Sequence, residues 1–159
     1  MRPANDCVFD HPLAGRLGIV LAGAAICRVY FLDARTPLRS PTSAAARRAR
    51  RALQAVLDDP HARPEVELQL NGTAFQRRVW AELQRIPPGR VCTYGELAQR
   101  LGSGARAVGN ACRRNPVPLL VPCHRVVPVR GIGGFAGARG GRWVALKRSL
   151  LAREGVEIG

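Results

Sequence analysis

Cys123, His124 and Arg125 are consecutive, and their side chains are the ones in this chain best suited to covalent chemistry. A cysteine is a useful nucleophile only as a thiolate, so a nearby base or positive charge must lower its pKa. His124 is the candidate base and Arg125 a candidate charge. Neighbouring side chains of an extended strand point to opposite sides, so His124 would reach the sulfur through a bend or a bridging water. The alternative is an ordinary buried Cys–His pair, because free cysteine is among the most buried residue types.

A carboxylate that orients the imidazole would complete a Cys–His–acid relay, and Glu154 is a candidate for that role. The sequence alone does not bring Glu154 near His124. The other cysteines form no C-x-x-C pair and lie at no zinc-ligand spacing from a histidine, so we interpret them as buried small hydrophobic residues. They are Cys7, Cys27, Cys92 and Cys112. We therefore expect no metal site and no disulfide framework, and we expect a reducing compartment.

The charge of the chain favours a polyanionic partner. There are 25 Lys and Arg residues against 11 Asp and Glu residues, a formal net charge of +14 among 159 residues. Such a field attracts nucleic acid, although a basic surface that serves solubility or ribosome association is the alternative. The longest apolar run, from Leu17 to Ile26, is shorter than the ~20 residues of a membrane span, and nearby acids make it a poor signal peptide. We expect no membrane association and a cytoplasmic protein.

The first part of the chain predicts a small sheet with a helix. Residues 17–32 are apolar and β-branched, which indicates two strands joined by a turn around Gly23. Ser43 is a candidate N-cap of a helix with one apolar face. That face consists of Ala49, Leu53, Val56 and Leu57. The alternation over residues 65–70 predicts one more strand, and we place a domain boundary near residue 70.

The second part predicts a mostly helical domain. Thr73 and Gln76 form a capping box that opens a helix, and Thr93 is the candidate N-cap of another helix over residues 94–101. Glycines at 102 and 104 separate that helix from one over 105–114, which is helix-turn-helix spacing, at about 94–114. The second of these helices is thin, because Gly109 and small neighbours carry little side chain. It suits either a close approach to another surface or tight packing inside the protein.

We predict a short buried strand over 119–121, directly before Cys123. A final amphipathic helix ends at Glu154 and Gly155 and turns four large apolar side chains inward. They are Trp143, Leu146, Leu150 and Leu151. The fold class is thus α/β, or α+β: a small amino-terminal lobe of sheet and helix, then a mostly helical domain with a helix-turn-helix and the cysteine motif.

Several motifs resemble one known family. Residues 122–127 (Pro-Cys-His-Arg-Val-Val), preceded by 106–109 (Arg-Ala-Val-Gly) and 115–116 (Asn-Pro), resemble the signature of the O6-alkylguanine-DNA alkyltransferases, or methylated-DNA-protein-cysteine methyltransferases. Motifs at 73–80, 86–89, 93–98 and 150–155 follow in the family's order. The resemblance covers about half the chain. It implies a catalytic and DNA-binding domain over 71–159, whereas residues 1–70 only loosely resemble the family's variable, ribonuclease H-like amino-terminal lobe.

The resemblance implies a role for each matching residue. Cys123 would accept the alkyl group irreversibly, His124 would deprotonate it through a water, and Glu154 would orient His124. Asn115 would brace the site, and Tyr94 would lie beside the extruded nucleotide and help protonate the departing guanine. No cofactor is implied.

The implied partner is double-stranded DNA that contains O6-alkylguanine, bound through the minor groove, with no further protein required. Arg106 would fill the space left by the flipped base. The implied DNA-binding residues are Arg106, Ala107, Gly109, Arg113, Arg114, Thr93 and Arg125, and the implied substrate pocket consists of Tyr94, Val126, Phe135 and Ala136. The chain departs from the family pattern in a shorter turn between the paired helices and in extra residues near 140–144.

Two other functions compete with repair. Relatives with a different residue at the position of Cys123 bind alkylated DNA without repairing it, so a non-enzymatic lesion sensor is one alternative. A helix-turn-helix transcription regulator is the other, although the small residues of the second helix suit a major-groove reader poorly. The preferred alkyl group, activity on O4-alkylthymine and the oligomeric state stay open.

Overall fold

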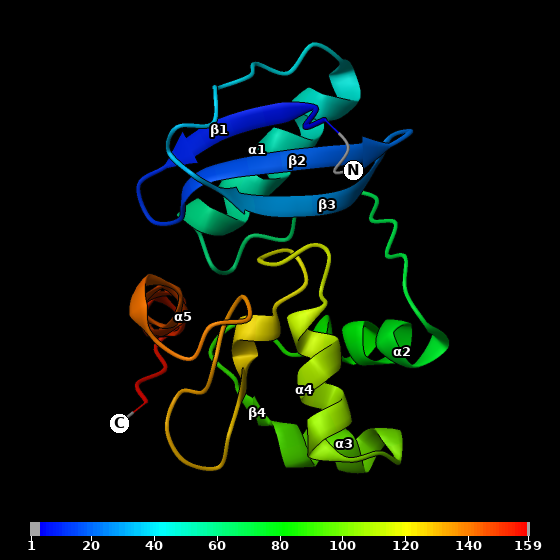
Figure 1. The fold of residues 1–159 in the computed structure, drawn as a ribbon, viewed down its shortest axis with the longest axis vertical. Helices are drawn as coiled ribbons and strands as arrows, with labels where there is room; N and C mark the ends of the chain where they lie inside the picture. The colour runs from blue at the N-terminus through cyan, green and yellow to red at the C-terminus, as the bar shows by residue number, and fades with distance from the viewer. Residues whose placement is uncertain (1–3, 159) are drawn as a thin grey trace. The chain divides into compact units, whose positions relative to one another are not determined.

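The computed structural model describes residues 4–158 and divides into two units between Asn71 and Gly72 (Figure 1). The mixed α/β class predicted from the sequence is confirmed. No helix within the described residues is long and apolar enough to cross a bilayer.

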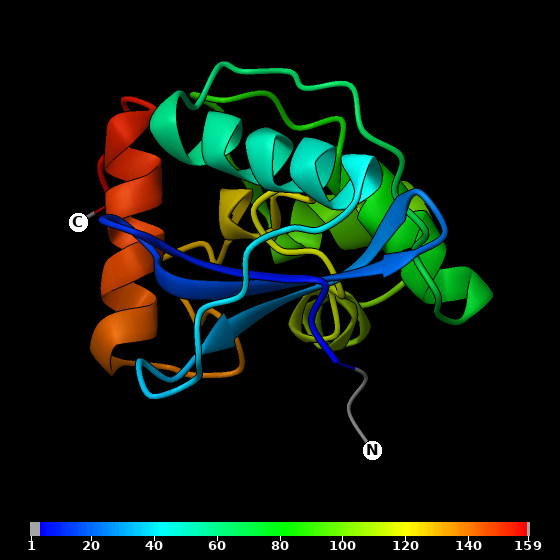
Figure 2. The ribbon, with the colours of Figure 1, turned by 90° about the horizontal axis from the view of Figure 1, so that it is seen from above.

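The first unit is an antiparallel meander with a helix across one face (Figure 2). Its strands are β1 (Cys7–His11), β2 (Gly15–Ala22) and β3 (Ala25–Leu32), and the helix is α1 (Ala44–Asp58). The predicted turn between β2 and β3 contains Gly23 at φ +62°, a backbone conformation that glycine adopts at little cost. Ser43 caps α1 as predicted, because its side chain accepts a hydrogen bond from the Ala46 amide. Strand β1 was not predicted.

The strand predicted over residues 65–70 is wrong. The segment is extended but forms only one isolated bridge, in which Leu68 pairs with Ile26. Two backbone hydrogen bonds hold it, from Ile26 N to Glu67 O and from Gln69 N to Ile26 O. Its apolar residues Val66, Leu68 and Leu70 are only half-buried, so their packing does little to stabilise a longer ladder.

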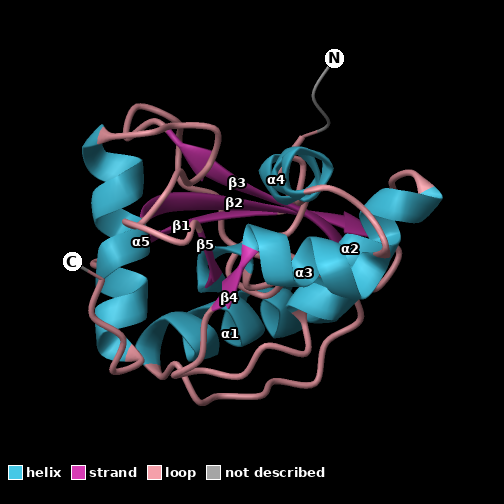
Figure 3. Ribbon diagram, turned by 90° about the horizontal axis from the view of Figure 1, so that it is seen from below, coloured by secondary structure: helices cyan, strands magenta, loops and turns pink. Residues whose placement is uncertain are grey.

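The second unit packs helices around a short parallel ladder (Figure 3). Helix α2 (Ala74–Leu83) begins at the predicted capping box, in which the Thr73 and Gln76 side chains each accept from the other's backbone amide. The buried Trp80 indole donates to the Ala111 carbonyl at 2.9 Å, which ties α2 to α4 (Ala105–Arg113). Helix α3 (Tyr94–Leu101) begins at Thr93 and ends at the left-handed Gly102, so the helix-turn-helix is present.

The parallel ladder places the start of α3 beside the cysteine motif. Strand β4 (Cys92–Thr93) leads into α3, and its partner β5 (Val126–Val127) directly follows the short 3-10 helix η1 (Cys123–Arg125). The register pairs Cys92 with Val126 and Thr93 with Val127. Helix α5 (Gly141–Arg153) then brings Glu154 to the same region.

The buried strand predicted over 119–121 is also wrong. Leu119 lies in a turn at φ +77°, and the Val121 amide donates to the Val117 carbonyl at 3.0 Å. The chain folds back because Pro116, Pro118 and Pro122 lack the amides that a ladder needs. This turn leads into η1, so Cys123 and His124 lie in a 3-10 helix rather than in an extended strand.

Candidate active site

Cys123 lines a cavity of about 400 Å³ in the second unit. Tyr94 at the start of α3 and one face of α4 form one side, and the turn over residues 134–139 forms another. The Cys123 side chain is half-buried in this cavity. The thiol is therefore placed where a group entering the cavity can meet it.

A buried network lies next to Cys123. His124 Nε2 is 2.9 Å from Glu154 Oε2, and these side chains are only 3% and 2% exposed. The Arg125 Nε donates to Glu154 Oε1 at 2.9 Å, its Nη2 donates to Oε2 at 3.2 Å, and its Nη1 donates to the Ile86 carbonyl at 2.7 Å. The predicted proximity of Glu154 to His124 is thus present in the structure, and Arg125 shares the same carboxylate.

The charges of this network define which nitrogen of His124 is a base. Burial acts to raise the pKa of Glu154, but hydrogen bonds from His124 and Arg125 outweigh it and hold that pKa at about 2. Burial lowers the pKa of His124 more than Glu154 raises it, so the imidazole is neutral near pH 7. A carboxylate only accepts hydrogen bonds, so Nε2 carries the proton and Nδ1 is unprotonated. Nδ1 is buried and has no hydrogen-bond partner within residues 4–158.

The Cys123 thiolate expected from His124 and Arg125 is not preformed. Burial raises the pKa of Cys123 and outweighs a hydrogen bond with Asn115, the charge of Lys147 and a backbone hydrogen bond, which all lower it. Arg125 gives no comparable help because Glu154 neutralises it, and His124 is uncharged. The thiol must therefore lose its proton during the reaction rather than before it.

Lys147 is a site residue that sequence reasoning missed. It is 0% exposed, and its Nζ donates to the Val126 carbonyl at 2.8 Å and to the Gly134 carbonyl at 3.1 Å. Burial lowers its pKa to about 8, which leaves it mostly charged at neutral pH. A signal existed, because position 147 lies on the inward stripe of α5 between Trp143 and Leu150, where a lysine needs a buried partner.

The structure places Asn115 and Tyr94 close to Cys123. The Asn115 side chain donates to the Val121 carbonyl at 2.8 Å and accepts from the Val117 amide at 3.0 Å, so it braces the turn that ends at Cys123. Burial, with the nearby Cys112 and Cys123, raises the pKa of Tyr94 to about 12. The phenol is therefore protonated at neutral pH and can donate a hydrogen bond or a proton into the cavity.

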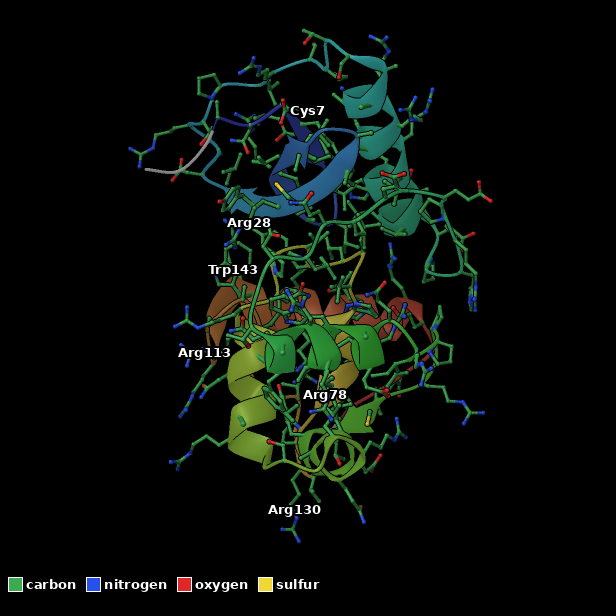
Figure 4. All side chains as sticks on the ribbon, turned by 90° about the vertical axis from the view of Figure 1, so that its right-hand side faces the viewer. Cys7, Arg28, Arg78, Arg113, Arg130 and Trp143 are labelled. Atoms are coloured by element: carbon green, nitrogen blue, oxygen red, sulfur yellow. The ribbon has the colours of Figure 1, made fainter. Side chains whose placement is uncertain are left out.

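The exposed face of helix α4 is basic and also contains small residues. Arg106, Ala107, Arg113 and Arg114 are exposed, whereas Val108 and Ala111 are buried beneath them. Arg113 extends away from α4 in Figure 4. A Cβ at Gly109 would meet only the Tyr94 ring at 4.0 Å, an ordinary contact distance, so packing inside the protein does not require this glycine. Residues 72–159 also hold 15 of the 25 Lys and Arg residues but only 4 of the 11 acids.

Comparison with known proteins identifies the family to which the chain belongs. The sequence model described as "6-O-methylguanine DNA methyltransferase, DNA binding domain" matches residues 74–156, which is more than half of the chain. The chain belongs to the 6-O-methylguanine DNA methyltransferase family. A methylated-DNA–protein-cysteine methyltransferase of Saccharolobus islandicus is 46% identical over 91 residues, a match that spans 57% of this chain and 57% of that relative.

Solved structures of this methyltransferase family resemble the chain over most of its length. A variant of the Mycobacterium tuberculosis protein OGT has a TM-score of 0.74 at 32% identity and covers 96% of this chain and 93% of its own. The structure of Mycobacterium tuberculosis OGT in complex with DNA has a TM-score of 0.73 at 35% identity and covers 92% and 90%.

Two residues that the family resemblance assigned are placed elsewhere by the structure. Arg125 was expected to bind DNA, but three of its five N–H groups donate to Glu154 and the Ile86 carbonyl and its side chain is only 12% exposed, so it is poorly placed to bind a phosphate. Val126 was expected in the substrate pocket, but it is 0% exposed in β5 and does not line the cavity. Phe135 and Ala136 do line the cavity. The Thr93 hydroxyl accepts from the Glu96 amide as the N-cap of α3, so its DNA role stays a prediction.

Proposed function

We propose that this methyltransferase-family member repairs DNA by transferring the alkyl group of an O6-alkylguanine to Cys123, once per protein molecule. The observation that carries the proposal is that the Cys123 thiol lines an open cavity and that the next residue, His124, forms a buried pair with Glu154. That pair supplies a base next to a thiol that must lose its proton during the reaction. Within residues 4–158 no three side chains of His, Cys, Asp or Glu gather as a metal site requires, and none of the proposed steps uses a metal.

The proposed reaction is an in-line displacement at the alkyl carbon. The sulfur of Cys123 forms a bond to that carbon while the bond between the carbon and O6 breaks. The thiol proton moves through a water to Nδ1 of His124, and Glu154 stabilises the imidazolium that forms. The Tyr94 phenol protonates the departing guanine. The product is a thioether that ordinary reductants do not reverse, so the protein is consumed.

A stacked base cannot be attacked in line, so the proposal includes extrusion of the guanine into the cavity. Extrusion costs a few kcal/mol and is easiest for a weakly paired lesion. The exposed face of α4 would enter the minor groove, where Ala107 and Gly109 permit a close approach, and Arg106 would occupy the space of the flipped base. Arg113 and Arg114 would bind phosphates, independently of sequence.

The Arg106→Ala variant tests extrusion. We expect the rate of transfer from a methylated duplex to fall about tenfold or more, because the lost stacking is no longer replaced. Transfer from the free base O6-benzylguanine, which needs no extrusion, should be unchanged. Single-turnover rates with both substrates measure the two effects. Equal losses on both substrates would contradict the role of Arg106.

We also propose a division of labour and a location. Residues 72–159 would hold catalysis and DNA binding, and residues 1–71 would be the family's variable, ribonuclease H-like lobe. A basic protein that acts on chromosomal DNA would be cytoplasmic and associated with the nucleoid.

The intact mass of the protein decides between repair and its alternatives. After incubation with a duplex containing one O6-methylguanine, the protein should gain one methylene, on the peptide that contains Cys123. An unchanged mass despite tight binding to the lesion would favour the lesion sensor. Affinity that depends on operator sequence and ignores the lesion would favour the transcription regulator.

A further inference from the structure

The cavity that contains Cys123 is lined by arginines from two separate segments. Arg106 and Arg113 come from α4, and Arg139 comes from the turn over residues 134–139. None of the described residues that line the cavity is acidic. The sequence analysis assigned Arg106 and Arg113 to DNA, but it assigned nothing to Arg139.

A tight turn holds Arg139 in place. The Phe135 amide donates to the Ala138 carbonyl at 2.8 Å, and the Ala138 amide donates back to the Phe135 carbonyl at 2.9 Å. The central residues Ala136 and Gly137 have φ values of +52° and +80°, the pattern of a type I′ turn. The backbone that presents Arg139 is therefore defined before any ligand arrives.

Gly134 and Lys147 fix the other arm of this turn. A Cβ at Gly134 would lie 2.7 Å from the Ala138 carbonyl oxygen and 3.9 Å from Cγ of Arg139, so only glycine lets the two arms approach this closely. The buried Lys147 ammonium binds the Gly134 carbonyl at 3.1 Å and anchors that arm to β5. The stem of Arg139 thus rests on a supported surface.

Arg139 is exposed, and among the described residues no hydrogen bond or ion pair involves its guanidinium. Arg125 is the contrast, because its guanidinium is nearly buried and makes three hydrogen bonds to Glu154 and the Ile86 carbonyl. An arginine on a supported turn at a cavity without acids is suited to an anion that enters with the ligand. A guanidinium binds phosphate oxygens in a bidentate manner, which suits the ligand that the proposed function requires.

We propose that Arg139 binds a phosphodiester next to the everted nucleotide, from the cavity wall that the turn over residues 134–139 forms. The inference rests on the proposed function, because a nucleotide whose base enters the cavity brings its flanking phosphates to the cavity mouth. Arg106 and Arg113 hold the DNA from the α4 wall, and Arg139 holds the everted strand from the other. The turn over residues 134–139 is thereby a second DNA-binding element, separate from the helix-turn-helix.

The Arg139→Gln variant tests this inference, with Arg139→Lys as the conservative change. Arg85→Gln is the matched control, because Arg85 is exposed in the same unit, makes only a surface pair with Glu82 and does not line the cavity. Transfer rates are measured with a methylated duplex at several salt concentrations and with free O6-benzylguanine. For Arg139→Gln we expect about a tenfold slower reaction with duplex and a salt slope smaller by about one, as for the loss of one phosphate contact.

Free O6-benzylguanine should react with Arg139→Gln at the wild-type rate, and Arg139→Lys should keep the salt slope. An unchanged salt slope overturns the inference, and so does an equal loss on the free base, which would mean a damaged cavity wall. If the wild-type protein itself gains no mass from the methylated duplex, the proposed function fails. If the wild type transfers and Arg139→Gln matches Arg85→Gln, only the role of Arg139 fails.

Discussion

The Cys123→Ala variant will bind a duplex containing O6-methylguanine and will transfer nothing. The sulfur is the only atom of the side chain that can bond to the alkyl carbon, whereas the proposed DNA contacts come from α4 and the turn over 134–139. Cys112 lines the same cavity, but burial, with the nearby Cys123, raises its pKa to about 12. The raised pKa disfavours a Cys112 thiolate, so we expect no transfer to Cys112 in this variant.

Intact mass measures transfer, and anisotropy with methylated and unmodified duplexes measures binding. Cys27→Ala is the matched control, because it removes a half-buried thiol from β3 in the other unit and should transfer normally. A methyl group found on Cys123→Ala protein would move the acceptor to another residue. Loss of lesion binding in that variant would mean that the sulfur also contributes to recognition.

Features that depend on neighbouring residues were predictable from the sequence. Ser43, Thr73 and Thr93 each cap a helix as predicted, because an N-cap hydrogen bond spans only three residues. The left-handed Gly102 likewise ends α3. These local signals placed the two helices of the helix-turn-helix correctly along the chain.

Features that depend on tertiary contacts were not predictable. The role of Arg125 changed because Glu154, distant in sequence, takes up its guanidinium. The pKa of Cys123 rises rather than falls because burial, which the sequence does not reveal, outweighs the nearby charges. The buried position of Lys147 was not predicted because a basic residue on an amphipathic helix is normally assigned to the solvent-exposed face. Here its ammonium donates to two backbone carbonyls inside the protein.

The Glu154→Gln variant will slow transfer by about 10²- to 10⁴-fold, the range of a general base such as His124, whose function Glu154 supports. A glutamine fills the same space but is neutral, so it neither fixes the proton on His124 Nε2 nor stabilises the imidazolium that forms. Glu154 acts through His124, which makes it a positioning residue. Free O6-benzylguanine should show the same loss as the methylated duplex, because the effect does not involve DNA.

The pH dependence separates positioning from a merely structural role. Glu154 raises the pKa of His124 against the lowering by burial, so its loss should lower that pKa further. The acidic limb of the rate profile with free O6-benzylguanine should therefore move to lower pH in Glu154→Gln. A slower variant with an unshifted profile would mean that Glu154 only supports the fold.

The free energy of unfolding should depend on pH through the ionisation of Glu154. Because the folded pKa of Glu154 is about 2 against an ordinary value of 4.5, its ionised form stabilises the fold above pH 4.5. That contribution, about 3 kcal/mol, is lost as the pH falls from 4.5 towards 2. Urea unfolding of the wild type and Glu154→Gln should therefore differ most at neutral pH and converge in acid. As a control for the transfer assay, Asp10→Asn removes the exposed Asp10–Arg16 pair in the other unit and should leave transfer unchanged. A stability difference that persists undiminished at pH 2 would mean that shape, not the carboxylate charge, carries the effect of Glu154.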